Sequence, residues 1–148
     1  MILISHRGNL NGSKPQDENR IYYIEKAIQK GFDVEIDLWV YQNELFLGHD
    51  EPQYLTSLDW LKTHSSKLWI HCKNLECLEI MNSFSFKKLN YFFHENDEAT
   101  ITSKGDIWCY PGNYINNGVT VCLQYETIPS YIKGICSDEI LKYEKENT

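Results

Sequence analysis

The fold is decided by the stretch FDVEIDLWV at residues 32–40. Its apolar residues alternate with the carboxylates Glu35 and Asp37, and this period of two predicts a β-strand with both acids on one side. An edge strand with one solvated face would also explain the pair. A strand early in a parallel sheet normally has both faces covered, however, so we expect the two carboxylates to point inward. Inward carboxylates repel each other, and a hard divalent cation such as Mg²⁺ or Ca²⁺ would compensate them.

Strands and helices alternate on either side of this stretch. Apolar runs predict further strands at residues 1–4, 68–72, 91–94, 106–110, 119–123 and 133–136, with a hairpin extension at 44–48. Helices are predicted at 18–30, 57–64, 75–84 and 139–145. This order predicts an α/β protein with a single domain spanning residues 1–148. We expect an abridged TIM-type (β/α) barrel with shortened helices in its C-terminal half, because eight full strand–helix units need roughly 200 residues.

Composition excludes several classes of function. A net charge of −7 without a Lys/Arg cluster argues against a nucleic-acid partner. No apolar stretch approaches the ~20 residues of a membrane span, and Ser5 interrupts the apolar start, so we expect neither a span nor a signal peptide. The five cysteines lack Cys-x-x-Cys spacing and are expected to be buried free thiols in a reducing compartment. These features predict a cytoplasmic protein that acts on a small molecule, and they leave the oligomeric state open.

Ionisable side chains lie at or near the carboxyl ends of four successive predicted strands. They are His6, Arg7, Glu35, Asp37, His71, Lys73 and His94. Parallel α/β folds gather their functional groups at that edge, so we expect one shared mouth. For His94 the sequence favours neither a functional nor a structural role. Trp108 and Tyr110 are expected in the core or in the wall of a pocket.

Two histidines suggest acid–base chemistry. Taken alone, His6 could be a loop histidine and His49 a turn residue, with Asp50 making a local turn. As a pair they suit the cleavage of a phosphodiester, because one group must take a proton from the nucleophile and another must give one to the leaving oxygen. Arg7 offers a fork of donors for phosphate oxygens. Lys73 is a second candidate cation for the charge that builds in the transition state.

These motifs resemble the glycerophosphodiester phosphodiesterase family, within the wider group of phosphatidylinositol-phospholipase-C-like phosphodiesterases. The resemblance covers residues 1–75 and consists of HRG at 6–8, EN at 18–19, GFDVEID at 31–37, GHD at 48–50 and the lysine at 73. It implies a TIM-type barrel that hydrolyses glycerophosphodiesters to glycerol 3-phosphate and an alcohol. It also implies roles for six residues: acid and base for His6 and His49, ligands of Mg²⁺ or Ca²⁺ for Glu35 and Asp37, and phosphate binding for Arg7 and Lys73.

Three features depart from the family pattern. His71 stands where a glutamate usually provides a third metal ligand, and imidazole suits Mn²⁺ or Zn²⁺ better than Mg²⁺ or Ca²⁺. The customary insertion after the His-Asp motif is absent, and the chain is shorter than typical members, although residues 134–138 resemble the family's last strand. We therefore expect a compact metal-dependent phosphodiesterase for a glycerophosphodiester-like substrate. Two alternatives stay open: a cyclising lyase similar to the sphingomyelinase D-like phospholipases, and a non-catalytic phosphate-binding module.

Overall fold

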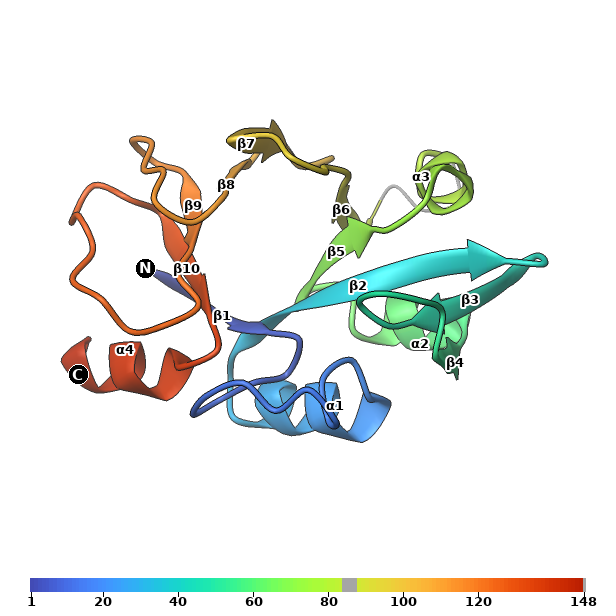
Figure 1. Cartoon of the computed structure of the whole chain (residues 1–148), viewed down its shortest axis with the longest axis horizontal. Helices are drawn as coiled ribbons and strands as arrows, with labels where there is room; N and C mark the ends of the chain where they lie inside the picture. The colour runs from blue at the N-terminus through green and yellow to red at the C-terminus, as the bar shows by residue number, and fades with distance from the viewer. Residues whose placement is uncertain (84–87, 148) are drawn as a thin grey trace.

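The computed structural model describes residues 1–83 and 88–147, which form ten strands and four short helices (Figure 1). The strands are β1 (Ile2–His6), β2 (Asp33–Tyr41), β3 (Glu44–Leu47), β4 (Tyr54–Thr56), β5 (Leu68–Cys72), β6 (Asn90–Phe92), β7 (Ala99–Ile101), β8 (Ile107–Cys109), β9 (Val119–Val121) and β10 (Gly134–Ser137). The helices are α1 (Ile21–Gln29), α2 (Leu58–Thr63), α3 (Leu75–Met81) and α4 (Ile140–Glu146). Every predicted strand and helix has a counterpart, while β4 and β7 were not predicted. The predicted end of the third helix at Phe84 lies outside the described residues.

Seven strands run parallel and lie side by side in the order β6-β5-β2-β1-β10-β9-β8. β7 pairs antiparallel with β8, and β3 and β4 extend β2 as an antiparallel ribbon. The first strand of the chain lies between β2 and the last strand, since Ser5 is opposite Val34 on one side and Ser137 on the other. The sheet curls into a half-barrel whose ends approach each other at β6 and β7 (Figure 1). There the N–H of Ser103 donates to the carbonyl oxygen of Tyr91 at 2.8 Å.

The abridged TIM-type barrel predicted from the sequence is wrong. The molecule is a mixed, strand-dominated half-barrel in which helices do not alternate with strands all the way round. Between β6 and β10, which the structure describes without a gap, the chain forms three short strands joined by turns and irregular loops. The expected shortened helices are missing because these connections carry turn residues such as Pro111, Gly112 and Gly118 and have no apolar stripe at helical spacing.

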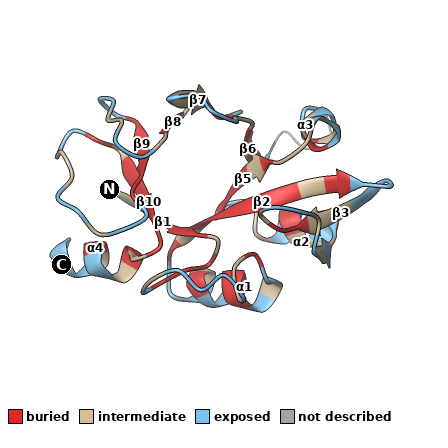
Figure 2. Ribbon diagram, in the orientation of Figure 1, coloured by how far each residue is buried: buried red, intermediate tan, exposed pale blue. Residues whose placement is uncertain are grey.

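Helices cover the outer face of the sheet on the side of β1, β2 and β5 (Figure 1). The side chains of Ser57 and Asn74 cap α2 and α3 by accepting from main-chain N–H groups three residues later. Ile36 and Leu38 of β2 are fully buried in the outer core beneath these helices. Figure 2 shows β2 buried over most of its length. Since successive residues of a strand point to opposite faces, the same packing turns Glu35 and Asp37 to the concave side.

A second apolar cluster fills the inside of the curled sheet. It consists of Ile4, Trp69, Phe92, Trp108, Val119, Val121 and Cys136, and we call it the inner plug. Phe92 stacks on Trp108 with ring centroids 4.7 Å apart, and Trp69 lies against the same indole at 5.7 Å. The inner plug supports the polar residues that follow on the same strands.

The five cysteines are buried and unpaired, which confirms the prediction that they are buried free thiols. None of the helices within residues 1–83 and 88–147 combines the length and the apolar character needed to cross a membrane.

Candidate active site

The candidate site is one layer of side chains above the inner plug. Six strands carry a plug residue, and the residue two positions later returns to the same face. These later residues are His6, His71, His94, Tyr110, Leu123 and Asp138, two positions after Ile4, Trp69, Phe92, Trp108, Val121 and Cys136. All except Asp138 line a cavity of about 190 Å³ at the carboxyl ends of the parallel strands. His6 and His71 lie within their strands, and the other four residues come one or two positions after strand ends, so this layer continues the inner face of the sheet beyond the inner plug.

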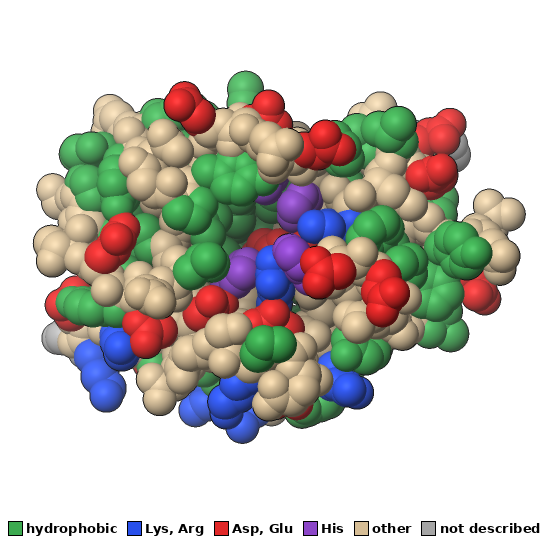
Figure 3. Space-filling view, in the orientation of Figure 1, with side chains coloured by type: hydrophobic (Ala, Val, Ile, Leu, Met, Phe, Trp, Pro, Cys, Tyr) green, Lys and Arg blue, Asp and Glu red, His purple; other side chains and the backbone are tan. Residues whose placement is uncertain are grey.

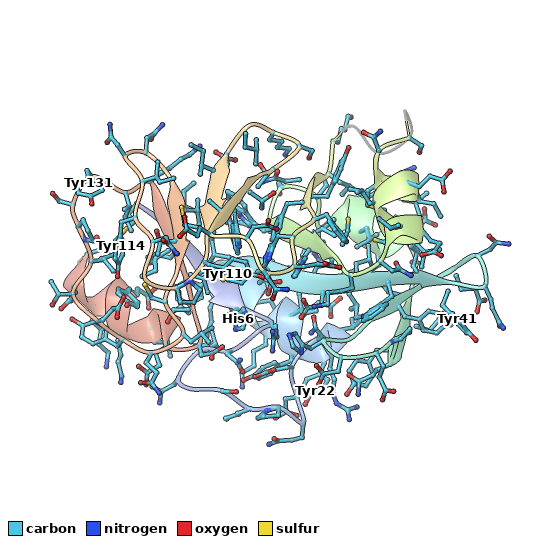
Figure 4. The ribbon with its side chains drawn as sticks, turned by 45° about the horizontal axis from the view of Figure 1, so that its top comes forward. His6, Tyr22, Tyr41, Tyr110, Tyr114 and Tyr131 are labelled. Atoms are coloured by element: carbon cyan, nitrogen blue, oxygen red, sulfur yellow. The ribbon has the colours of Figure 1, made fainter. Side chains whose placement is uncertain are left out.

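The cavity has a charged wall and an apolar wall. The charged wall consists of His6, Arg7, Glu35, His49, His71 and His94. The apolar wall consists of Trp108, Tyr110, Pro111, Val121 and Leu123. Figure 3 shows histidines, Lys/Arg side chains and carboxylates gathered around a hollow whose other side is hydrophobic. Figure 4 places His6 and Tyr110 near the middle of the molecule, whereas Tyr41 and Tyr131 lie at its periphery.

Glu35, Asp37 and His71 could hold a metal ion. Each offers one ligand atom, and these atoms lie within 4.8 Å of one another. Oε2 of Glu35 and Oδ1 of Asp37 are buried, and neither has a hydrogen-bond partner among the described residues. Burial and the charge of Asp37 raise the pKa of Glu35. Two buried carboxylates, each with an oxygen that accepts no hydrogen bond from the described residues, together with an imidazole nitrogen, are a ligand set that fits a divalent cation.

Asp37 is completely buried and surrounded by donors. Asn19 Nδ2 donates to its Oδ2 at 2.9 Å, and Arg7 Nε lies 3.0 Å from the same oxygen. His71 Nδ1 and Lys73 Nζ lie 3.3 and 3.7 Å from Oδ1. Burial opposes ionisation of Asp37, but His71, Arg7 and Lys73 outweigh it and lower its pKa. Of the two predicted phosphate-binding residues, Arg7 lines the cavity, whereas Lys73 contacts Asp37 and is not part of the lining.

His6 is held by a carboxylate that the sequence analysis did not single out as a site residue. Its Nδ1 lies 2.7 Å from Oδ1 of Asp138, which also accepts from Asn9 Nδ2 at 2.8 Å. This contact leaves Nε2 of His6 as the nitrogen available to the cavity, 3.8 Å from Glu35 Oε2. Burial alone would lower the pKa of His6, but the hydrogen bond to Asp138 and the charge of Glu35 raise it. The sequence does carry a signal for Asp138, because it lies two positions after Cys136 of β10 and so returns to the face of the inner plug.

His49 lies on the loop after β3 and is the more exposed of the two histidines. Its Nδ1 lies 2.7 Å from Oδ1 of Asp50. The loop is fixed by Trp39, whose indole N–H donates to the Gly48 carbonyl oxygen at 2.6 Å. A Cβ on Gly48 would lie 2.1 Å from the Glu51 carbonyl oxygen, so only glycine allows this close approach. Partial burial, and then the charge of Arg7, lower the pKa of His49.

The turn after β1 adopts a backbone conformation that is unusual for its side chains. Arg7 and Asn19 both have positive φ, at 57° and 63°. The N–H of Arg7 donates to the Glu35 carbonyl oxygen at 2.9 Å, and its own carbonyl oxygen accepts from Asn19 N–H at 3.1 Å. Glu18 accepts from Arg7 Nη1 at 3.2 Å and from Asn9 at 2.9 Å. Glu18 and Asn19 of the sequence motif thus position Arg7 and Asp37.

His94, which the sequence left open, lies in the cavity wall. Its ring stacks on His71 with centroids 4.3 Å apart, and the ring of Tyr110 meets it edge-on at 4.2 Å. The carbonyl oxygen of His94 lies 3.3 Å from His71 Nε2. Burial and the charge of His71 lower the pKa of His94 to about 4. His94 therefore orients His71 and is uncharged at neutral pH.

The structure thus brings His6, Arg7, Glu35, His49 and His71 onto one wall of one cavity, with Asp37 directly behind them. No protein-family model, curated protein or solved structure gave a significant match to this chain. The chemistry of the site is therefore argued from its residues and their geometry.

Proposed function

We propose that this chain is a metal-dependent phosphodiesterase that acts on a small, glycerophosphodiester-like substrate. The observation that carries the proposal is the convergence of His6, Arg7 and His49 on one cavity beside the cluster of Glu35, Asp37 and His71. Phosphodiester cleavage needs two proton-transfer groups and positive charge around the phosphoryl oxygens, and this arrangement supplies both. The resemblance of residues 1–75 to the glycerophosphodiester phosphodiesterase family points to the same reaction.

The cation would be held by Glu35, Asp37 and His71. Mg²⁺ or Ca²⁺ suits the two carboxylates, and Mn²⁺ suits the set with His71 included. When bound, such a cation polarises a phosphoryl oxygen and neutralises part of the charge that builds on it. Arg7 lines the cavity and offers its guanidinium to the other phosphoryl oxygens. Lys73 acts through Asp37, which it holds ionised from 3.7 Å.

Proton transfer is assigned to the two histidines. Asp138 holds Nδ1 of His6, which leaves Nε2 to exchange a proton with the substrate. His49 is partly exposed and has a lowered pKa, so it is neutral at pH 7 and can accept a proton from the nucleophile. His6 is then the donor to the leaving oxygen. This division follows the general rule that acid and base are distinguished by their environments.

The test is turnover of a phosphodiester panel, including glycerophosphocholine and bis(4-nitrophenyl) phosphate, with Mg²⁺, Ca²⁺, Mn²⁺ or EDTA. His6→Ala and His49→Ala should each lower kcat by about 10²-fold or more. His64→Ala is the matched control, because His64 lies outside the cavity near Glu25 and Trp60 and its loss should leave kcat unchanged. Turnover that survives both His6→Ala and EDTA would refute the proposal.

The same reactions distinguish the alternatives. A ³¹P NMR spectrum of the product mixture separates a linear monoester, the product of hydrolysis, from a cyclic ester, the product of a lyase. A non-catalytic phosphate-binding module has one observation in its favour, which is that Asp37 is already neutralised by Arg7 and Lys73. Such a module would be stabilised by phosphate but not by a divalent cation.

A further inference from the structure

We infer that the apolar wall receives the leaving alcohol, and that this alcohol carries an uncharged apolar group, aryl or alkyl, rather than a cationic headgroup. The inference rests on the proposed function and names the substrate class of that site. It starts from the asymmetry of the cavity, in which all the lining residues with a proposed catalytic, phosphate-binding or metal-binding role lie on the other wall. The phosphate is therefore bound most favourably at the charged wall, and one of the two ester groups of the substrate lies against the apolar wall.

The apolar wall offers few polar contacts. The side chains of Pro111, Val121 and Leu123 contain no hydrogen-bonding group, and the hydroxyl of Tyr110 already donates to the Glu95 carbonyl oxygen. Leu123, in the bend after β9, is 41% exposed, although Trp108 and Val121 of the same wall are buried. A bound apolar group would cover it, and burial of apolar surface is favourable. A polyol in the same place would lose hydrogen bonds to water without replacing them.

The wall is also poorly suited to a quaternary ammonium group. Such cations are recognised by the open faces of several aromatic rings. Trp108 is only 3% exposed, stacks on Phe92 and lies against Trp69, so little of its ring is open to a ligand. Tyr110 meets His94 with its ring edge, so the described residues of the wall offer a cation one open aromatic ring and no cage of several. The one carboxylate among the described residues that line the cavity, Glu35, belongs to the proposed metal cluster, and the nearby carboxylate of Asp138 is already paired with His6.

The position of His6 identifies which ester group lies on this wall. The N–H of Asp138 donates to the Leu123 carbonyl oxygen at 3.3 Å, and the side chain of Asp138 holds His6. Leu123 and His6 are thus joined through one residue, and the proton donor lies at the border of the apolar wall. In the step, the bond between phosphorus and the ester oxygen breaks while His6 Nε2 gives that oxygen its proton. A water molecule forms the new bond to phosphorus and gives its proton to His49, and both histidines then exchange protons with solvent.

The experiment compares two diesters of glycerol 3-phosphate that differ only in the second alcohol, 2-phenylethanol or choline. Choline is chemically the better leaving group, because its ammonium stabilises the alkoxide, so a preference for 2-phenylethanol must come from the protein. We expect kcat/KM at least tenfold higher for the phenylethyl ester. Leu123→Ser should lower that value about tenfold and lower the value for glycerophosphocholine by a clearly smaller factor.

Leu75→Ser is the matched control, since Leu75 is 68% exposed on α3 and does not line the cavity. Thermal melting of both variants checks that they fold. Faster cleavage of glycerophosphocholine, or an equal effect of Leu123→Ser on both esters, would overturn the inference while the proposed function stands. Absence of turnover with every diester, in the presence of each cation, would overturn both.

Discussion

The contact between Asp138 and His6 yields the most demanding prediction. Asp138→Asn keeps the size of the side chain but removes its charge. Oδ1 of Asp138 accepts from His6 Nδ1 at 2.7 Å and from Asn9 Nδ2 at 2.8 Å, and Asp138 is 8% exposed. A buried hydrogen bond to a charged group contributes about 1.5–3 kcal/mol, so the free energy of unfolding should fall by roughly that amount at pH 7.

The effect on activity should be larger than the effect on stability. The asparagine would lack the hydrogen bond and the charge of the carboxylate, which raise the pKa of His6 against the effect of burial, so less of the ring would be imidazolium at pH 7. An amide that presents its NH₂ group to Nδ1 would hold the neutral tautomer with its proton on Nε2, and neutral imidazole is a far weaker acid towards the leaving oxygen than imidazolium. Loss of the carboxylate that orients a catalytic histidine costs about 10⁴-fold in a serine protease, and we expect a loss of about 10²–10⁴-fold in kcat here. Stopped assays of the phosphodiester panel at pH 7 measure it.

The stability difference should depend on pH with a defined sign. The pKa of Asp138 is lowered from 3.8, because its hydrogen bond from His6 and the charge of His6 outweigh the opposing effect of burial. A carboxyl with a lowered pKa in the folded state stabilises the protein above its unfolded pKa, and this contribution is lost as pH falls through the folded pKa. The gap in Tm between wild type and Asp138→Asn should therefore close as the pH falls below 3.8. Because the same contact raises the pKa of His6, the gap should also narrow as the pH rises through that raised pKa, above 6.5.

Asp106→Asn is the control for this experiment, because Asp106 makes a partly buried ion pair with Lys133 away from the cavity. It should lose stability and keep kcat. If Asp138→Asn melts lower but retains full kcat, Asp138 is only a structural partner of His6 and the reasoning is refuted.

Three further predictions concern the neighbouring groups. Glu35→Gln should raise the Tm of the metal-free protein at pH 7, since a buried carboxyl with a raised pKa destabilises the fold when it is ionised. The variant should also lose the rise in Tm that Mn²⁺ or Mg²⁺ gives the wild type, and a metal response that persists would contradict the proposed metal site. Gly48→Ala should displace the His49 loop, and should lower kcat more than tenfold and the free energy of unfolding by about 1–3 kcal/mol. Gly105→Ala is the control and should leave kcat unchanged, because the added Cβ would have no neighbour within 4 Å. The acid limb of the pH profile of kcat/KM should lie below pH 6.5, because burial and Arg7 lower the pKa of His49, and a limb above pH 6.5 would exclude His49 as the base.

Local patterns predicted the central part of the molecule. The alternation in residues 32–40 predicted β2 and the inward orientation of Glu35 and Asp37, because a period of two leaves only two faces to choose between. The position of His6 and His71 at strand ends predicted that they would meet, since parallel strands end at one edge. The first inference needs only the pattern of a single strand, and the second needs in addition only that the strands run parallel. Neither requires the order in which the strands pair.

The parts that failed depend on contacts far apart in the chain. Asp138 is separated from His6 by 132 residues. Its place after the last predicted strand indicates the same edge of the sheet, but its contact with His6 follows only once β10 is known to lie beside β1. The strands β4 and β7 were missed because each is three residues long and none of their residues is buried. The helices expected beyond β6 came from extending the alternation of the first half, whereas turn residues in the second half favour direct connections between strands.

The pairing of β1 with β10 has a consequence for the order of events in folding. Ile2 lies opposite Gly134, so the middle of the sheet forms only when nearly the whole chain has been brought into register. Such long-range pairings lose chain entropy when the loop closes, before any stabilising contacts have formed, and proteins dominated by them fold slowly. An incomplete nascent chain lacking residue 138 would leave His6 without its carboxylate. The contact between His6 and Asp138 should therefore form only when β10 closes the middle of the sheet. After dilution from denaturant, activity should recover with the same time course as the burial of Trp69 and Trp108.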